Sequence, residues 1–312
     1  MEKNIPIKIS SEIEHAIKKS KPIVILESAV LTHGLPMIEN GGRVKSQPES
    51  LLLPVATALA VETAVREAGA VPATVGVKNK KIIIGLQKED LLELAIDPNR
   101  VKVSPTNFAR TLAKGRQGGT TVGGTLVAIQ ALQKCHYFLK PVMSTGGIGG
   151  VHRNWSNHLD ISADLIALSK TPCLVICAGA KSILDKSATI EMLETLGVPA
   201  LGWKCDKWPV FIEKNQGNEP SIDRVDNISE VVSTANTHWT ISDSSLILAR
   251  QLETNDAINP ICLNENNVTG KERTPALLNL LAEKSKGKSL NANIKLLTRN
   301  ALLAASCASK FN

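Results

Sequence analysis

A lysine follows directly on an apolar run in the middle of the chain. Lys181 comes after "CLVICAGA" (173–180), which reads as a buried strand ending in small residues. Apolar surroundings disfavour the charged form of an amine, and a neutral lysine can attack a carbonyl carbon. The alternative is that the side chain extends past the strand end to water. The residue type alone leaves both roles open, a nucleophile or a solvated surface lysine.

Other polar residues also follow or lie within predicted strands. Glu27 comes after "PIVIL", where an acid could donate a proton or serve as the partner of a helix cap. Lys102 lies within "RVKVS". The segment "TGGIGG" (145–150) precedes His152 and Arg153. Glycines allow a phosphate to approach the backbone closely and cations bind it, although an ordinary solvated turn would have the same glycines. These residues predict an anion site only if several of the strand ends lie together.

Two carboxylates lie four residues apart in "LDISADL". If this segment were helical, Asp160 and Asp164 would share one face and repel each other. A magnesium or manganese ion with oxygen ligands would remove that repulsion. The alternative is that one aspartate caps a helix starting near Ser162 while the other is exposed, and the spacing alone favours this alternative.

The elements that must position these residues alternate along the chain. Apolar, strand-like runs are "PIVILESA", "VPATVGV", "KIIIGL", "RVKVS", "YFLKPVMST", "PCLVICAG" and "VPALGW". Helix-like segments are 9–20, 55–68, 88–95, 122–134, 162–169 and 188–196. Continuous apolar strands separated by helices predict a mainly parallel or mixed sheet covered on both faces, a three-layer α/β/α fold. Residues 272–308 read as two helices joined around "GKSLNAN", a helical C-terminal cap, and the polar stretch 212–230 as a surface excursion.

Composition and charge limit the possible functions. The chain has 312 residues, which fit a single domain over 1–312, and its net charge of +7 favours anionic partners such as a phosphorylated small molecule. Aromatic residues make up only 3%, so the core must be built from aliphatic side chains. The same scarcity, without any basic run, argues against a nucleic-acid binder, because such proteins stack bases on aromatic side chains.

The cysteines and the N-terminal segment predict a cytoplasmic protein. Six cysteines show no CxxC spacing, which indicates buried free thiols rather than disulfides or a zinc site. The N-terminal segment has no apolar signal core, and no window reaches the roughly 18 apolar residues that a membrane helix needs. We expect a reducing compartment and no membrane partner.

Eight motifs occur in an order that is typical of one family. They are "ESAVLTHGLP", "GAVPATVGV", "GGTTVGGT", "TGGIGGVHR", "LDISADL", "CAGAKSILD", "LETLGVPALGW" and "GKERTPALLNLL". Together they resemble the pseudouridine-5'-phosphate glycosidase family, also called indigoidine synthase A-like, from about residue 8 to residue 308. The resemblance implies reversible cleavage of the C–C bond between uracil and ribose 5-phosphate, through a lysine adduct of the Schiff-base type and with a divalent metal, usually Mn²⁺.

The resemblance also implies roles for individual residues. Lys181 matches the nucleophile, Glu27 the proton donor and Asp160 the metal-linked aspartate. The implied substrate contacts are Lys102, Val122, His152, Ser162, Ala163, Asp164 and Asn293, with Lys102 and His152 on the phosphate side. Family members are commonly homotrimers. Because the chain ends at Asn312, without the kinase domain fused to some members, we expect a separate pseudouridine kinase.

Three stretches depart from the family pattern. Where the family continues "SRRDLP" after Lys102, this chain reads "SPTNFA", which replaces two arginines, an aspartate and a leucine. The stretches 41–54 and 134–147 are longer than usual. Two alternatives therefore stay open: another Schiff-base lyase or C-glycosyl enzyme acting on a sugar phosphate, and a binding or scaffold protein that keeps the fold without the activity.

Overall fold

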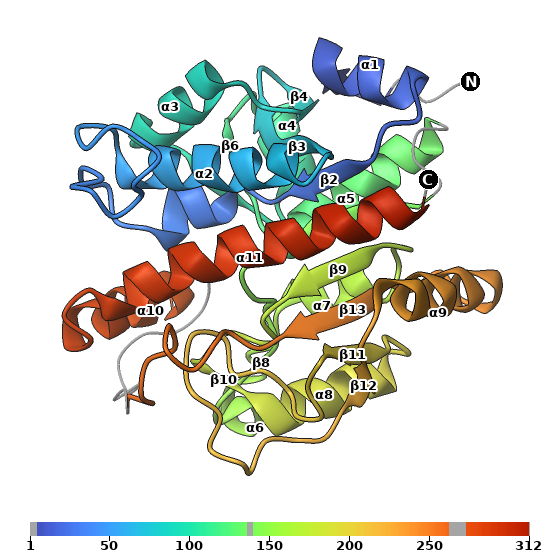
Figure 1. Cartoon of the computed structure of the whole chain (residues 1–312). Coiled ribbons are helices and arrows are strands. Elements are labelled where there is room, and N and C mark those ends of the chain that lie inside the picture. The colour runs from blue at the N-terminus through green and yellow to red at the C-terminus, as the bar shows by residue number, and fades with distance from the viewer. Residues whose placement is uncertain (1–4, 136–139, 262–272, 312) are drawn as a thin grey trace.

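The structure, a computed structural model, describes residues 5–135, 140–261 and 273–311, and an 11-stranded sheet forms its centre (Figure 1). In spatial order the main strands are β1 (Ile7–Ile9), β4 (Lys81–Ile84), β3 (Val71–Lys78), β2 (Ile23–Leu26), β7 (Val142–Ser144), β9 (Leu174–Cys177), β13 (Leu246–Arg250), β11 (Ala200–Trp203) and β12 (Asp223–Val225). Strand β6 (Gly118–Thr120) pairs with β3, and β5 (Val101–Val103) with β6.

The sheet is mixed, with a long parallel part. Every neighbouring pair from β3 through β2 to β12 is parallel. Strand β3 pairs antiparallel with β4 and with β6. A separate antiparallel ribbon joins β8 (Val151–His152) to β10 (Leu184–Asp185). Because parallel strands end at one edge of the sheet, the segments that follow β2, β7 and β9 meet there.

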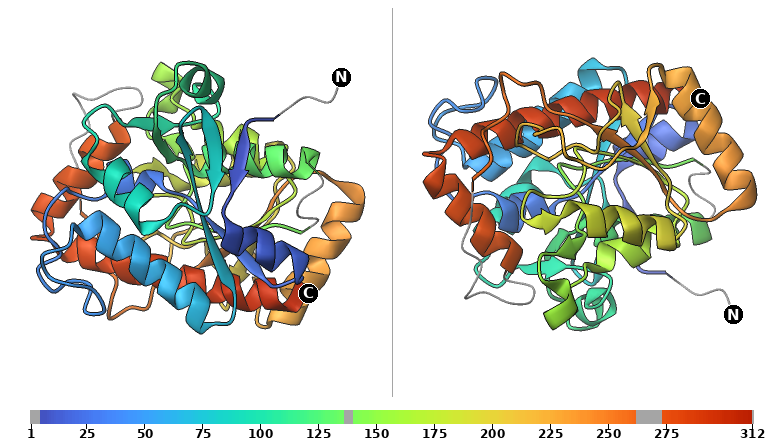
Figure 2. Two further views of the ribbon diagram at one scale, coloured as in Figure 1. Left: turned by 90° about the horizontal axis from the view of Figure 1, so that it is seen from above. Right: turned by 90° about the horizontal axis from the view of Figure 1, so that it is seen from below.

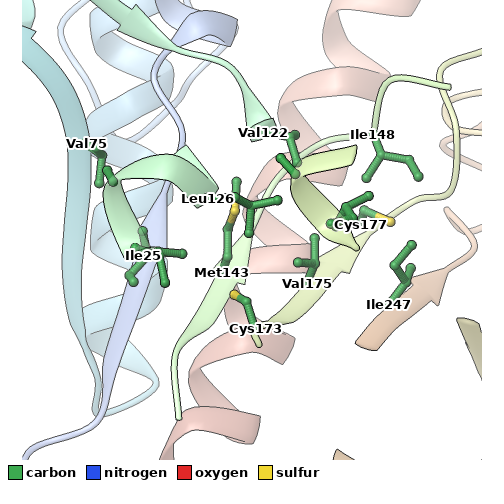
Figure 3. Close-up of a cluster of buried hydrophobic side chains, with 14 of the residues drawn as sticks. Ile25, Val75, Val122, Leu126, Met143, Ile148, Cys173, Val175, Cys177 and Ile247 are labelled. Carbon is green, nitrogen blue, oxygen red and sulfur yellow. The ribbon is translucent and has the colours of Figure 1, made fainter. Parts of the chain in front are cut away.

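Helices cover both faces of the sheet, as the continuous apolar strands predict (Figure 2). Ile25 of β2 faces one apolar cluster, whereas Val24 and Leu26 face the other. Figure 3 shows the first cluster, whose members include Leu126 and Met143. Most of its helical residues come from α1 (Ser11–Lys18), α4 (Phe108–Ala113), α5 (Val122–Lys134), α7 (Ala163–Leu168) and α8 (Lys186–Thr195). The three-layer α/β/α prediction is confirmed.

The second face is covered mainly by a long C-terminal helix. α11 (Lys288–Phe311) packs against β2, β7 and β9 and against its neighbours on that face, α2 (Leu53–Glu67) and α9 (Ile228–Ile241) (Figure 1). Helix α3 (Lys88–Ile96) packs beside α2, and α10 (Arg273–Lys284) precedes α11. The two predicted C-terminal helices are present, but their joint lies at 285–287, so most of "GKSLNAN" is the first part of α11.

Two other predictions about local structure were confirmed only in part. The helix predicted over 9–20 is present as α1, but it begins at Ser11, and Ile9 belongs to strand β1, which pairs with β4. Much of the stretch 212–230 is exposed, as predicted, but Ile212 and Glu219 are buried and β12 lies within it. Glu219 is drawn inward by a turn, whose backbone N–H groups at Gln216 and Gly217 each donate to its carboxylate at 2.9 Å. None of the described helices is long and apolar enough to cross a membrane.

Candidate functional site

A pocket lies at the carboxyl ends of the parallel strands, where sequence motifs placed the polar residues. It encloses about 520 Å³, including its open mouth. Its lining consists of Glu27, Ala29, Val30, His33, Gly34, Lys102, Thr121, Val122, Gly146, Gly147, Lys181, Phe211 and Asn293. Five of the residues predicted from the sequence, Glu27, Lys102, Val122, Lys181 and Asn293, therefore share this pocket although they come from five separate segments.

Lys181 is held by the pairing of two loops. After β9 the chain turns at Gly179, whose φ of +78° is unfavourable for other residues, and a Cβ there would lie 2.3 Å from the Pro209 carbonyl oxygen. The N–H of Ile148 donates to the Gly179 carbonyl at 3.0 Å, and the N–H of Lys181 donates to the Ile148 carbonyl at 3.3 Å. The glycine loop and the lysine loop thus fix each other, and the half-buried Lys181 side chain reaches the pocket.

Glu27 is a buried acid with a hydrogen bond to each carboxyl oxygen. The Thr145 hydroxyl donates to Oε1 at 2.8 Å, and the Val30 N–H donates to Oε2 at 3.3 Å. Val30 begins a π-helical turn, η1 (Val30–Gly34), a local irregularity common near functional sites. Burial raises the pKa of Glu27 despite the opposing charge of Lys181. A carboxyl group that favours its protonated form suits a proton donor.

His33 is a pocket residue to which sequence reasoning gave no role, although it lies within "ESAVLTHGLP". Burial, with the positive charges of Arg100 and Lys102, lowers the pKa of His33 to about 4. Its Nδ1 lies 2.8 Å from the Thr32 hydroxyl. The ring is therefore neutral near pH 7, and the charge of Lys102, which also lines the pocket, contributes to this shift.

Asn293 enters the pocket from α11. The side chain is only 8% exposed, and in the described part of the chain its Oδ1 is buried without a hydrogen-bond partner. A Cβ at Gly146 would lie 3.5 Å from that oxygen, so the glycine loop passes close beside it. A buried acceptor without a partner is costly, and a ligand that donates to it would remove the cost.

Asp164 connects the walls of the pocket from behind. Its Oδ1 accepts from the Gly123 N–H at 2.8 Å and its Oδ2 from the Gly149 N–H at 2.9 Å. Gly123 belongs to the first turn of α5 next to Val122, and Gly149 to the glycine loop. The carboxylate therefore fixes both segments through their backbones, and it does not itself line the pocket.

The substitution Asp164→Asn should destabilise the protein. The amide keeps one acceptor but turns an NH₂ group towards the Gly123 or the Gly149 N–H, which leaves a buried donor facing a donor. We expect the free energy of unfolding to fall by roughly 2–4 kcal/mol. Urea denaturation measures this difference, with Asp160→Asn as the matched change in the same segment. An equal loss in both variants would contradict the connecting role.

The remaining predicted residues lie outside the pocket lining. His152 is in β8, and its Nδ1 lies 4.0 Å from Asp160 Oδ2. Ser162 caps α7 by accepting from the Asp164 N–H at 3.2 Å, and Ala163 is the first helical residue. Asp160 precedes the helix, so the two aspartates do not share a helical face.

No group of three His, Cys, Asp or Glu side chains able to hold a metal occurs among the described residues. A half-buried carboxylate such as Asp160 still fits a hard divalent ion that keeps most of its waters, as Mg²⁺-type sites do. Five cysteines, 135, 173, 177, 205 and 307, are free thiols, and Cys262 lies outside the described residues.

The loop "SPTNFA" forms a closed turn. Asn107 Oδ1 accepts from the Ser104 N–H at 2.8 Å, and its Nδ2 donates to the Lys102 carbonyl at 3.0 Å. Phe108 is buried, and a Cβ at Gly123 would lie 2.9 Å from Pro105. These contacts support the backbone of Lys102 in place of charged side chains. The stretch 41–54 contributes no residue to the pocket lining. Of the third departure, 134–147, residues 136–139 lie outside the described residues, and Gly146 and Gly147 line the pocket.

Comparison with known proteins gives one family over the whole length. The family model "Indigoidine synthase A like protein" matches residues 12–310. A pseudouridine-5'-phosphate glycosidase of Mycoplasmopsis agalactiae is 37% identical over 98% of both chains. The enzyme of that name from Escherichia coli is 36% identical over 98% of this chain and 95% of its own.

Two solved structures have the same fold. An indigoidine synthase A-like protein of Thermotoga maritima superposes with a TM-score of 0.83 at 28% identity, covering 99% of this chain and 98% of its own. The prealnumycin C-glycosynthase in complex with ribulose 5-phosphate gives a TM-score of 0.81 at 30% identity, covering 99% and 97%.

Proposed function

Since the chain belongs to the indigoidine synthase A-like family, we propose that it reversibly cleaves the C–C glycosidic bond of pseudouridine 5'-phosphate, giving uracil and ribose 5-phosphate. One observation carries this proposal: a lysine and a buried acid with a raised pKa, Lys181 and Glu27, line the same pocket. Cleavage of this carbon–carbon bond needs both an electron donor at C1' of the sugar, which turns into an iminium, and a proton for the departing carbon. Lys181 supplies the first and Glu27 the second.

The proposed steps balance in atoms and charge. The nitrogen of Lys181 bonds to C1' of the ribose as the C1'–O4' bond breaks, and the proton lost by the amine balances the one gained by O4'. Electrons from nitrogen then break the C1'–C5 bond, leaving an iminium at C1', while C5 of uracil takes a proton from Glu27. Water converts the iminium to the aldehyde of ribose 5-phosphate, which restores the lysine amine and returns a proton to Glu27.

The other pocket residues fit substrate binding. Lys102 supplies a cation for the phosphate, and Asn293 offers its buried oxygen to a donor on the substrate. Val122 forms part of the wall at the first turn of α5. We assign His152 to the phosphate side, and Ser162, Ala163 and Asp164 to the segment that shapes the pocket from outside its lining. Held remote from the reacting bond, the phosphate would anchor the sugar.

We further propose that Asp160 holds Mn²⁺ or another divalent cation. Bound there, the ion would supply a Lewis acid able to orient water or a uracil carbonyl. The chain would act as one domain over 1–312, as a homotrimer in the cytoplasm, with a separate pseudouridine kinase supplying the 5'-phosphate. The free thiols at the described cysteines fit a reducing compartment.

A second candidate reaction is C-glycosyl chemistry on another sugar phosphate. The structural likeness to a C-glycosynthase bound to ribulose 5-phosphate favours it. That reaction would use the same lysine and acid and differ in the base or acceptor that is recognised.

The test is to incubate the purified protein with pseudouridine 5'-phosphate and Mn²⁺ and to follow uracil and ribose 5-phosphate by chromatography. We expect equal amounts of both products, and far slower release from unphosphorylated pseudouridine because the anchoring charge is missing. A folded protein that converts ribose 5-phosphate only with another acceptor would favour the second candidate. A folded protein inactive in both assays would overturn the enzymatic assignment.

A further inference from the structure

A buried asparagine outside the pocket lining contacts the backbone behind the proposed acid. Asn300 lies two turns after Asn293 in α11 and is 0% exposed. Its Nδ2 donates to the Thr145 carbonyl at 2.9 Å and lies 3.4 Å from the Gly146 carbonyl. Thr145 and Gly146 directly follow β7, where the glycine loop begins. The last helix of the chain therefore holds the strand end from which this wall of the pocket is built.

Thr145 links Asn300 to Glu27 by hydrogen bonds. While its carbonyl accepts from Asn300, its hydroxyl donates to Glu27 Oε1 at 2.8 Å, and the residue is only 1% exposed. The backbone of Thr145 is held on the other side as well, because its N–H donates to the Ile176 carbonyl at 3.0 Å. A continuous path of hydrogen bonds thus runs from α11 through Thr145 to one named oxygen of Glu27.

Packing alone does not explain an asparagine at position 300. Its neighbours on the inner face of α11, Leu296, Leu297, Ala301 and Ala304, are all buried and apolar. Within the described residues, its Oδ1 is buried without a hydrogen-bond partner. An unsatisfied buried acceptor typically costs about 1–3 kcal/mol, so an apolar residue would suit packing alone better. What asparagine adds at this position is its NH₂ group, aimed at two carbonyl oxygens.

We propose that Asn300 is a positioning residue, which acts through Thr145 to fix the Glu27 carboxyl and leaves Oε2 as the oxygen that carries the transferable proton. A hydroxyl that donates to Oε1 disfavours a proton on that same oxygen. From the described parts of the chain, Oε2 accepts only the longer bond from the Val30 N–H, so it is the oxygen that can be protonated and turn towards the pocket. The inference rests on the proposed function where it speaks of proton transfer, but the hydrogen-bond path itself can be tested without substrate.

The first test is the titration of Glu27 by NMR, in protein labelled at the glutamate carboxyl carbons with ¹³C and assigned with Glu27→Gln. The Thr145 bond stabilises the carboxylate, so its removal in Thr145→Val should move the titration of Glu27 upward by roughly one pH unit. Thr145→Ser should restore the wild-type curve. Asn300→Ala should move the curve in the same direction, because Thr145 loses its support.

Asn40→Ala is the matched control. Asn40 is also 0% exposed, and its Nδ2 donates to three carbonyls, those of Val44, Gln47 and Pro48, none of which belongs to the pocket lining. It should cost stability and leave the Glu27 titration unchanged. A wild-type titration in folded Asn300→Ala, or an equal shift in Asn40→Ala, would overturn the proposal. If alanine at 300 does not fold, Asn300→Leu keeps nearly the same shape and removes the amide donor without adding a charge, and the same criteria apply.

Kinetics then separate this inference from the proposed function. In an active enzyme, Asn300→Ala should lower kcat for uracil release about 10- to 100-fold with little change in KM, because proton transfer is misaligned while the binding wall stays. A loss confined to KM would contradict the positioning role. If the wild-type protein releases no uracil, the proposed function fails, whereas the NMR titrations still decide the link between Asn300, Thr145 and Glu27.

Discussion

Replacement of Lys181 by alanine should abolish uracil release while leaving the fold intact. The side chain is half-buried at a loop whose hydrogen bonds come from backbone atoms, so its truncation removes the amine without removing the contacts that shape the pocket. Loss of a nucleophile that forms a covalent intermediate costs roughly 10⁴-fold or more in kcat. Single-turnover assays with pseudouridine 5'-phosphate and Mn²⁺ would measure the residual rate.

Mass spectrometry can detect the covalent adduct on Lys181 directly. Borohydride added during turnover should reduce an iminium on the wild-type enzyme, and peptide mapping should locate the added ribose phosphate on Lys181. Lys186→Ala is the matched control, since this lysine lies five residues further along, outside the pocket lining, and pairs with Glu219 at 3.9 Å. If Lys181→Ala released uracil at a rate within tenfold of wild type, Lys181 would not be the nucleophile.

The fold and the pocket were predictable from the sequence to different extents. The strands β2 and β9 are short apolar runs that stay buried on both faces, and this alone predicts a sheet between two helical layers. The strand-end rule then placed Glu27 and Lys181 at one edge of that sheet. The apolar run of β13 escaped prediction, as did α9, because neither carries a motif. The strand at β5 was predicted from "RVKVS", whereas the short strands β6, β8 and β10 were not, because they are formed by pairing with a partner strand.

Contacts over long sequence separations could not be predicted from local patterns. The helical spacing of Leu296, Leu297 and Ala304 places position 300 on the inner face, but it does not show that the Asn300 side chain bonds a carbonyl 155 residues away. The start of α11 was missed for a related reason. Gly287 has a φ of +78° and ends the preceding turn, but the helix then runs directly through "KSLNAN" because its inner face packs on the sheet. Tertiary packing decided both positions.

The role of Asp164 could not be predicted from its spacing with Asp160. The spacing alone favoured a helix starting near Ser162 over a shared metal, and the helix does begin directly after Ser162, although the cap is Ser162 itself and neither aspartate. Asp164 instead satisfies two backbone N–H groups, from Gly123 and Gly149. Backbone donors at glycine turns leave no trace in a sequence, so the connecting role appears only when the three segments are seen together.

Glu27→Gln should inactivate the enzyme and, at neutral pH, stabilise it. Loss of a general acid costs about 10²–10⁴-fold in kcat. The effect on stability follows from the direction of the pKa shift. Burial raises the pKa of Glu27 in the folded state, so between the unfolded and the folded pKa the native protein binds a proton that the unfolded chain does not. This contribution is fully present below the unfolded pKa and is lost as the pH rises through the folded pKa.

The Glu27→Gln variant does not lose this stability as the pH rises, because glutamine is neutral at every pH and nearly the same size as glutamate. Near pH 4.5 the two proteins should unfold at similar denaturant concentrations, whereas at pH 7.5 the variant should be more stable by roughly 0.5–2 kcal/mol. Urea titrations at several pH values measure the difference. The matched control is Glu62→Gln, since burial also raises the pKa of Glu62, a carboxyl bonded by Thr74 at 2.5 Å outside the pocket lining. Both variants should gain stability with pH relative to wild type, but only the change at Glu27 should remove uracil release. If Glu27→Gln keeps the wild-type rate, or becomes less stable than wild type as the pH rises, then Glu27 is not a buried proton donor.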